Sequence, residues 1–192
     1  MAIPASLIAS ATWLCLALLL AAAVWHDLRS HRIPNRLVVS GFLLGLTLNG
    51  LLPQLATLPP GQMGGLGWGS SLLGAAAGLA VLLPMYLMRA LGAGDVKLMA
   101  VVGAFVGPEA VLGAAVATLV AGGVLALAAA LHGRVAGLML RNVRTLLTSS
   151  VVQLGSGGSP QVPALAQSAG KLPYAVAIAA GTAGYLAWRL AV

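Results

Sequence analysis

The sequence contains very few acidic residues and a single cysteine. Only Asp27, Asp95 and Glu109 carry a carboxylate among 192 residues, against ten Lys and Arg. The lone Cys15 excludes an intrachain disulfide and a cysteine-based zinc site, so we interpret it as an apolar packing residue. The alternating pattern of a membrane β-barrel is also missing. Acid-dependent chemistry, if the chain has any, must therefore use one of three side chains.

Long apolar runs dominate what is present. The chain is 60% hydrophobic and 7% charged. About 20 helical residues cross a hydrocarbon core, and lipid requires every backbone polar group to be paired, which favours helices. The pattern predicts an all-α polytopic membrane protein with about six transmembrane helices, at residues 6–25, 37–52, 66–88, 98–106, 110–131 and 172–190.

The boundary between the fourth and fifth predicted spans is set by Gly107, Pro108 and Glu109, because Pro followed by an acid is typical of a helix start. The fourth span is short. We expect it to begin within the preceding loop or to stop short of a full crossing. The apolar N-terminus has no basic region before it, and Trp25-His26-Asp27 follows in place of a small-residue cleavage site, so we expect a first span and not a cleaved signal peptide.

The basic residues predict the orientation. With six alternating spans, every Lys and Arg except Arg189 falls on one side, which the positive-inside rule makes cytoplasmic. Because these charges are spread over separate short loops, nucleic-acid binding is a poor interpretation of the +7 net charge. Both Asp27 and Asp95 lie on the predicted cytoplasmic side.

The chain is expected to form one membrane domain over residues 1–192. Within it, residues 133–152 have the pattern of a basic amphipathic helix on the membrane surface, and residues 155–170 that of a flexible cytoplasmic loop. Small residues four apart predict close helix packing. The pairs are Gly41 and Gly45, Gly65 and Gly69, Gly74 and Gly78, and Gly103 and Gly107.

The loop after Asp27 contains Pro34 and Asn35. Pro34 disfavours helix at the residue before it, and Asn35 is expected to cap the second span. A carboxylate at the end of a helix faces the negative end of the helix dipole, which is unfavourable. The alternative to a functional Asp27 is a solvated acid offset by Arg29 or Arg32.

Asp95 follows Gly92 and Gly94, which are expected to allow a tight turn that other residues would strain. Capping of the fourth span is the alternative role for this carboxylate. If the two aspartates approach each other, they cannot readily both ionise, and such a pair can activate water while polarising a carbonyl. Sequence spacing does not show whether they meet.

Two other classes of protein remain open at this stage. A proton-coupled transporter would use acids near mid-span and an internal repeat, whereas Asp27 and Asp95 lie at span ends and no convincing repeat is found. A non-catalytic membrane scaffold would use the aspartates for helix pairing and would tolerate loss of their charge.

Three segments carry a family resemblance. Residues 92–95, Gly-Ala-Gly-Asp, resemble the Gly-x-Gly-Asp signature of intramembrane aspartic peptidases. Asp27-Leu28-Arg29 with Ile33-Pro34-Asn35 resembles the first-aspartate loop of the type IV prepilin peptidases, and residues 171–181 are similar to the last-span motif of the small members that serve tight-adherence (Flp) pili. Presenilins and signal peptide peptidases share the glycine-aspartate signature but have Tyr where this chain has His26. Their resemblance to this chain is therefore weaker than that of the prepilin peptidases.

The resemblance implies an aspartic endopeptidase in the bacterial inner membrane, with Asp27 and Asp95 as the catalytic pair and no cofactor or metal. Its substrate would be a prepilin whose short basic leader is removed at the cytoplasmic face, with the pilus assembly machinery as a further partner. Larger members carry a Cys-x-x-Cys domain and methylate the new amine; neither property is carried over to a chain with one cysteine.

The residues around Asp27 and Asp95 are less directly indicated as functional. Gly92, Gly94, Lys97, Pro34 and Asn35 are expected to support the two motifs. Lys97 either tunes a nearby acid or anchors its span at the lipid headgroups. We expect His26 and His31 to be bystanders, Pro173 and Tyr174 to pack or to shape the cleft, and Glu109 to lie on the outer side.

Overall fold

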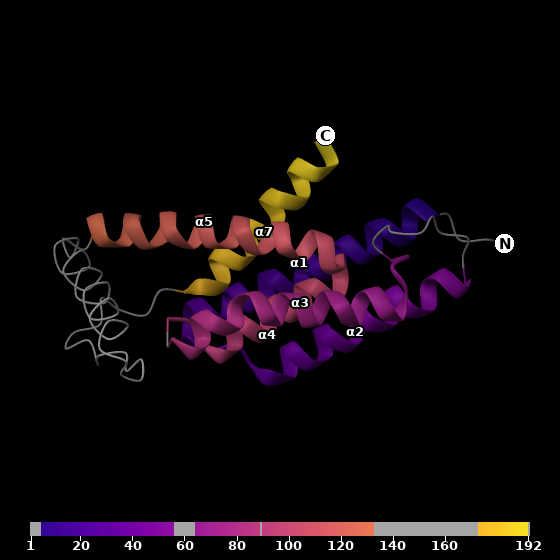
Figure 1. Cartoon of the computed structure of the whole chain (residues 1–192), viewed down its shortest axis with the longest axis horizontal. Coiled ribbons are helices and arrows are strands. Elements are labelled where there is room, and N and C mark those ends of the chain that lie inside the picture. Colours follow the sequence, from indigo (N-terminus) through magenta and orange to yellow (C-terminus); the bar gives the residue numbers. More distant parts are fainter. Residues whose placement is uncertain (1–4, 56–63, 89, 133–172, 192) are drawn as a thin grey trace, which may run out of the picture. The chain divides into compact units, whose positions relative to one another are not determined.

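The computed structural model describes residues 5–55, 64–88, 90–132 and 173–191, and over these ranges the chain forms six helices and no strand (Figure 1). The all-α prediction is confirmed. The helices are α1 (Ala5–Ser30), α2 (Asn35–Leu55), α3 (Gly67–Leu87), α4 (Ala93–Val106), α5 (Pro108–His132) and α7 (Tyr174–Ala191). The predicted surface helix at 133–152 and loop at 155–170 lie outside the described residues.

The chain divides into two compact units. One comprises residues 1–122 and 173–192, and the other residues 123–172. The described part of the second unit is the last portion of α5. All contacts discussed below lie within the first unit.

The helices follow the predicted apolar runs. α4 begins at Ala93, ahead of the predicted span at 98, which confirms that it starts within the preceding loop; α5 begins at Pro108 as expected. Three helices contain stretches long and apolar enough to cross a bilayer, Ala9–Ser30, Gly67–Leu87 and Pro108–Ala129. The chain is a polytopic membrane protein, and spans by α2, α4 and α7 stay predictions.

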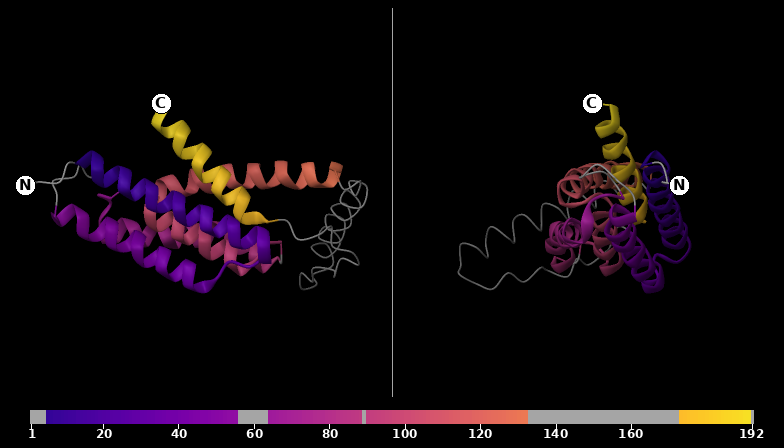
Figure 2. Two further views of the ribbon diagram at one scale, coloured as in Figure 1. Left: turned by 180° about the vertical axis from the view of Figure 1, so that it is seen from behind. Right: turned by 90° about the vertical axis from the view of Figure 1, so that its right-hand side faces the viewer.

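α4 is the central helix of the first unit. It packs against α1, α2, α3 and α7, and α7 runs obliquely to the other helices of this unit (Figure 2). Every residue of α4 from Leu98 to Val106 is buried except the half-buried Ala100. A helix enclosed in this way holds its two ends in fixed places.

Glycines allow α3 and α4 to approach closely. The place where a Cβ on Gly74 would lie is taken by the backbone of Gly103, and the reverse also holds. The packing prediction is therefore confirmed for these two residues, and likewise for Gly78, whose Cβ would meet the Met99 carbonyl. It is wrong for Gly69, which faces open space.

The C-terminal end of α4 is closed by buried hydrogen bonds. Gly107 has φ +85°, a conformation that suits glycine, and ends the helix. Asn49 Nδ2 donates to the carbonyls of Ala104 (2.8 Å) and Phe105 (3.1 Å), and its Oδ1 accepts from the Gly64 N–H (2.7 Å). Ser71 Oγ also donates to Ala104 O, at 2.7 Å.

These bonds explain how α4 can be short. A helix of 14 residues is about 21 Å long, less than a hydrocarbon core of roughly 30 Å, so its last carbonyls would lack partners within the apolar layer. Asn49 and Ser71 are completely buried and supply the missing donors. The other end of α4 is then fixed in position at the edge of the unit, where Asp95 lies.

Candidate active site

Asp27 lies in the last turn of α1 and is buried, with 6% of its surface exposed. Its Oδ2 accepts a hydrogen bond from the Ala175 backbone N–H at 3.0 Å, across 148 residues of sequence. Arg29 does not pair with it: that guanidinium lies over the Trp25 ring, 4.4 Å from its centroid. The interpretation of Asp27 as a solvated acid is therefore wrong.

The N-terminus of α7 offsets the unfavourable position of Asp27. The Asp27 carbonyl accepts from the His31 N–H at 2.8 Å where α1 ends, so the side chain sits at the negative end of α1. Ala175, however, is in the first turn of α7, whose N-terminus favours a negative charge. The Asp27 side chain is thus held by a helix from the other end of the chain.

Asp95 lies in the first turn of α4 and is half-buried. Its Oδ2 accepts from the Gly92 N–H at 3.1 Å, which confirms the predicted capping contact. Burial raises the pKa of Asp95 to about 6; the Gly92 hydrogen bond opposes this rise and the charge of Asp27 adds to it.

The two carboxylates lie close enough to interact electrostatically. α1 and α4 are in contact, and the place of a Cβ on Gly94 lies 3.2 Å from the Ile33 side chain, so the loop that follows Asp27 packs against the first turn of α4. Asp27 is close enough to Asp95 for its charge to disfavour ionisation there. The structure brings together the pair that sequence spacing left unresolved.

The reason for the glycines beside Asp95 differs from the one expected. Gly92 has φ −79°, and the φ of Gly94 is not positive, so neither residue adopts a left-handed conformation. Space is the constraint: a Cβ on Gly92 would lie 3.1 Å from Asp95 Oδ2, and one on Gly94 would press on Ile33. Both positions are small because the Asp95 turn is closely surrounded.

Asn35 also behaves differently from the prediction. It is the first residue of α2, after Pro34, whose carbonyl accepts from the Leu37 N–H at 3.0 Å. The Asn35 Oδ1 accepts from Lys97 Nζ at 3.1 Å and is thus engaged by α4. Lys97 is exposed and makes no ion pair within the part of the chain that the structure describes. The Asn35–Lys97 hydrogen bond links the start of α2 to the first turns of α4.

The other candidate residues differ in how near they lie to the two aspartates. His26 and His31 are exposed, and the structure describes no contact of either imidazole with Asp27 or Asp95. Tyr174 is half-buried, lies within reach of the charge of Asp95, and covers Gly122 of α5. Glu109 is exposed in the first turn of α5, beyond the far end of α4, and so stays outside the site.

Sequence reasoning missed the backbone N–H of Ala175, although it singled out the segment that carries it. A backbone donor has no side-chain signature, and only its place at a helix N-terminus after Pro173 hints at a free N–H. Within the described ranges, no group of three or more His, Cys, Asp or Glu side chains is arranged to hold a metal ion.

The arrangement places two carboxylates in unequal environments. Asp27 is buried and accepts a backbone N–H at the N-terminus of α7. Asp95 has a raised pKa, which favours the protonated form over a wider pH range. A site with one ionised and one protonated carboxyl group can take a proton from water and at the same time donate a hydrogen bond to a carbonyl.

Comparison with known proteins gives one result. The sequence pattern of the type IV leader peptidase family matches residues 13–127, a segment that covers more than half of the chain and contains both aspartates. No curated protein and no solved structure matches the chain.

Proposed function

The chain belongs to the type IV leader peptidase family, and on this premise we propose that it is an aspartic endopeptidase that removes the short basic leader of type IV or Flp prepilins. The family supports a membrane-integral peptidase. The more specific proposal of an aspartic prepilin peptidase rests on the interaction between Asp27 and Asp95, two acids far apart in the sequence. The two-aspartate chemistry needs this proximity.

The different environments of the two residues support a separate role for each. We expect the Asp27 carboxylate to act as the general base that takes a proton from the attacking water. Protonated Asp95 donates its proton to the scissile carbonyl oxygen as the tetrahedral intermediate forms. Collapse of the intermediate returns a proton from oxygen to Asp95, while Asp27 passes its proton to the leaving amine. Both carboxyl groups end in their starting states.

The location of the site fits a substrate that enters from the cytoplasmic side of the inner membrane. Asp27 lies in the last turn of α1 and Asp95 in the first turn of α4. Arg29 at the end of α1, Arg32 in the loop that follows, and Arg36 at the start of α2 lie near Asp27 in the sequence. The positive-inside rule places the loops beside the two aspartates in the cytoplasm. A leader that ends where a hydrophobic helix begins would present its scissile bond at this depth.

The test replaces Asp27 and Asp95 separately by Asn and co-expresses each variant with an Flp-type prepilin encoded in the same genome. Leader removal is followed by gel shift, with immunoblots to match the amount of enzyme in the membrane. Each substitution removes a proton-transfer group, and we expect processing to fall by about 10²–10⁴-fold.

Glu109→Gln is the matched control, because it neutralises the third acid of the chain outside the site. We expect normal processing. Normal processing by Asp27→Asn or Asp95→Asn would instead contradict the two-aspartate mechanism and favour a scaffold that tolerates the loss of charge.

A further inference from the structure

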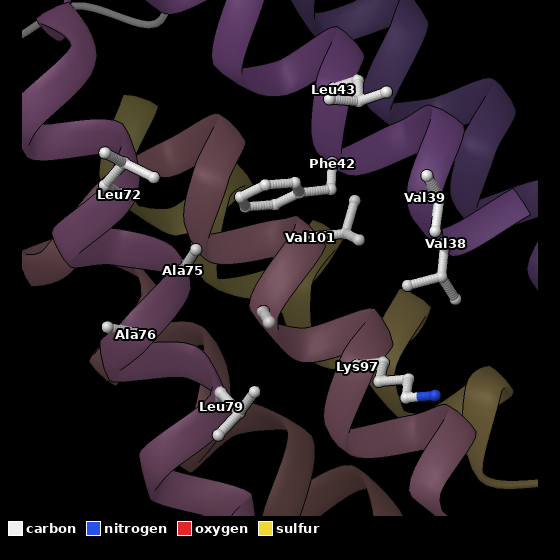
Figure 3. Close-up of a pocket in the computed structure, with 11 residues that line it drawn as sticks. Val38, Val39, Phe42, Leu43, Leu72, Ala75, Ala76, Leu79, Lys97 and Val101 are labelled. Carbon is white, nitrogen blue, oxygen red and sulfur yellow. The ribbon is translucent and has the colours of Figure 1, made fainter. Parts of the chain in front are cut away.

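An apolar groove lies between α2, α3 and α4, on a part of the molecule that the proposed chemistry does not use. It has a volume of about 570 Å³ (Figure 3). Its walls include Val39 and Phe42 of α2, Leu72 and Ala76 of α3, and Val101 of α4. Among the described residues that line it, Lys97 alone has a polar side chain. Figure 3 shows the Phe42 ring reaching from α2 toward α3, and the Lys97 ammonium at one end.

The groove faces away from the two aspartates. Residues two apart on a helix point to different sides, so Asp95 and Lys97 do not share a face of α4. Asp95 interacts with Asp27 of α1 and lies near Tyr174 of α7, whereas Lys97 borders the groove between α2 and α3. A ligand in the groove would thus touch α4 on the face opposite to the candidate active site.

The cation at the end of the groove has unused hydrogen-bonding capacity. An ammonium group has three donors, and the structure gives Lys97 Nζ one described acceptor, Asn35 Oδ1 at 3.1 Å. No carboxylate within the described ranges pairs with it. The Asn35 side-chain amide lies at the same end. An apolar ligand with an anionic, oxygen-rich head would complement both parts of this site.

The size of the groove favours a hydrocarbon chain over a peptide helix. A volume of about 570 Å³ is within the range of roughly 300–1,000 Å³ typical of small-molecule sites. A membrane-spanning helix about 10 Å wide and 30 Å long occupies on the order of 2,000 Å³. We propose that the groove binds one acyl chain of an anionic phospholipid, with the lipid phosphate held by Lys97 and Asn35.

The position of Lys97 gives this lipid a defined depth. Lys97 follows Asp95 in the first turns of α4, at the end of the helix that the positive-inside rule places at the cytoplasmic leaflet. Anionic headgroups attract basic side chains at this surface. The phosphate would join the start of α2, at Asn35, to the first turns of α4, and would add to the hydrogen bond that already links them.

The test measures lipid retention by the purified full-length protein with native mass spectrometry. Detergent-solubilised protein is stripped of lipid and titrated with phosphatidylglycerol or phosphatidylcholine of identical acyl chains. We expect one phosphatidylglycerol to be retained at about fivefold lower concentration than phosphatidylcholine, as one basic side chain near the headgroup provides. Lys97→Gln should abolish this preference, and Lys97→Arg should keep it.

A second variant tests the apolar part. Ala76→Leu places a larger side chain in the groove and should weaken retention of both lipids. Ala80→Leu is the matched control, because Ala80 is exposed on the same helix and does not line the groove; Arg189→Gln controls for loss of a basic charge elsewhere. Both controls should retain lipid as the wild type does.

Two results would overturn the proposal. One is equal retention of both lipids by the wild type, Lys97→Gln and Ala76→Leu proteins. The other is stoichiometric displacement of the bound phosphatidylglycerol by a synthetic peptide that comprises a prepilin leader and apolar helix, which would assign the groove to the substrate. Because these readouts count bound lipid and involve no cleavage, their failure is distinguishable from failure of the proposed peptidase function.

Discussion

The two ends of α4 use polar residues in different ways. At the C-terminal end, Asn49 and Ser71 are completely buried, and their hydrogen bonds go to backbone groups that would otherwise lack partners. At the N-terminal end, Asp95 is only half-buried, and its pKa is raised to about 6 by burial, with a contribution from the charge of Asp27. A polar group that is fully satisfied serves the fold, whereas a destabilised charge at an accessible edge is suited to chemistry.

Replacement of Asp95 by Asn should have the largest effect on activity and little effect on the fold. The amide is nearly isosteric and its oxygen can still accept from the Gly92 N–H, so the variant should not lose stability in mixed-micelle unfolding. Leader cleavage should fall by about 10²–10⁴-fold because the amide cannot supply the proton. A large loss of stability in this variant would mean that Asp95 serves the fold, as Asn49 and Ser71 do, and that the two ends of α4 do not differ in this way.

Replacement of Asn49 by Leu should produce the opposite result. The change leaves the Ala104 and Phe105 carbonyls with fewer donors and the Gly64 N–H without its described acceptor. We expect the free energy of unfolding in mixed micelles to fall by about 2–4 kcal/mol. Thr47→Leu is the matched control on α2, since the exposed Thr47 hydroxyl bonds only within its own helix, at 2.9 Å to the Leu43 carbonyl.

The control should lose less than about 0.5 kcal/mol. Stability of Asn49→Leu equal to that of the control would mean that the buried end of α4 does not depend on its side-chain donors.

The pH dependence of cleavage should reveal the protonation state of Asp95. The value of kcat/KM, which reports on the free enzyme, should fall about tenfold per pH unit as pH rises above about 6, because Asp95 then loses the proton that it must donate. A kcat/KM that stays constant or rises from pH 6 to 8 would contradict this role.

Stability should change over the same interval. The folded-state pKa of Asp95 is raised, so its favourable contribution is fully present below about 3.8, declines as pH rises, and is lost above about 6. Asp95→Asn should remove this part of the pH dependence, which can be measured as the difference between the two proteins in mixed-micelle unfolding from pH 4 to 7.

Two glycine substitutions compare the ends of α4 most finely. Gly107→Ala places a Cβ at φ +85° and should lower stability by about 1–2 kcal/mol. Gly94→Ala leaves the backbone relaxed but brings a Cβ to 3.2 Å from Ile33, so the Asp95 turn must shift by a few tenths of an ångström. We expect a smaller loss of stability, below about 1 kcal/mol, with a measurable decrease in kcat. Equal stability losses with equal activities would show that the two ends respond alike.

The helices were predictable from the sequence because apolar length and the Gly107-Pro108 break are local signals. The same is true of Asp27 and Asp95, which stand out in a chain with three acids. Asn49 and Ser71 were not predictable: each is a neutral residue in an apolar run, and its partner is a backbone carbonyl 55 or 33 residues along the chain. Such pairings depend on how α2, α3 and α4 pack.

Asn35 and Gly92 illustrate a second limit. Their residue types favour a helix cap and a tight turn, and both local predictions were reasonable. In the folded protein, Asn35 accepts a hydrogen bond from Lys97, and Gly92 provides space beside a carboxylate while its φ is −79°. Tertiary contacts decide between several uses of the same residue.

The hydrogen bond from Ala175 to Asp27 has a consequence for biosynthesis. The two residues are 148 positions apart, so at about 5–20 residues per second the ribosome makes the acceptor roughly 7–30 s before the donor. During that interval α1 can insert, but the Asp27 side chain lacks the backbone N–H that it accepts in the folded protein. The candidate site is therefore completed only after α7 has been synthesised, and a chain released before that point would hold both aspartates without the environment that makes them unequal.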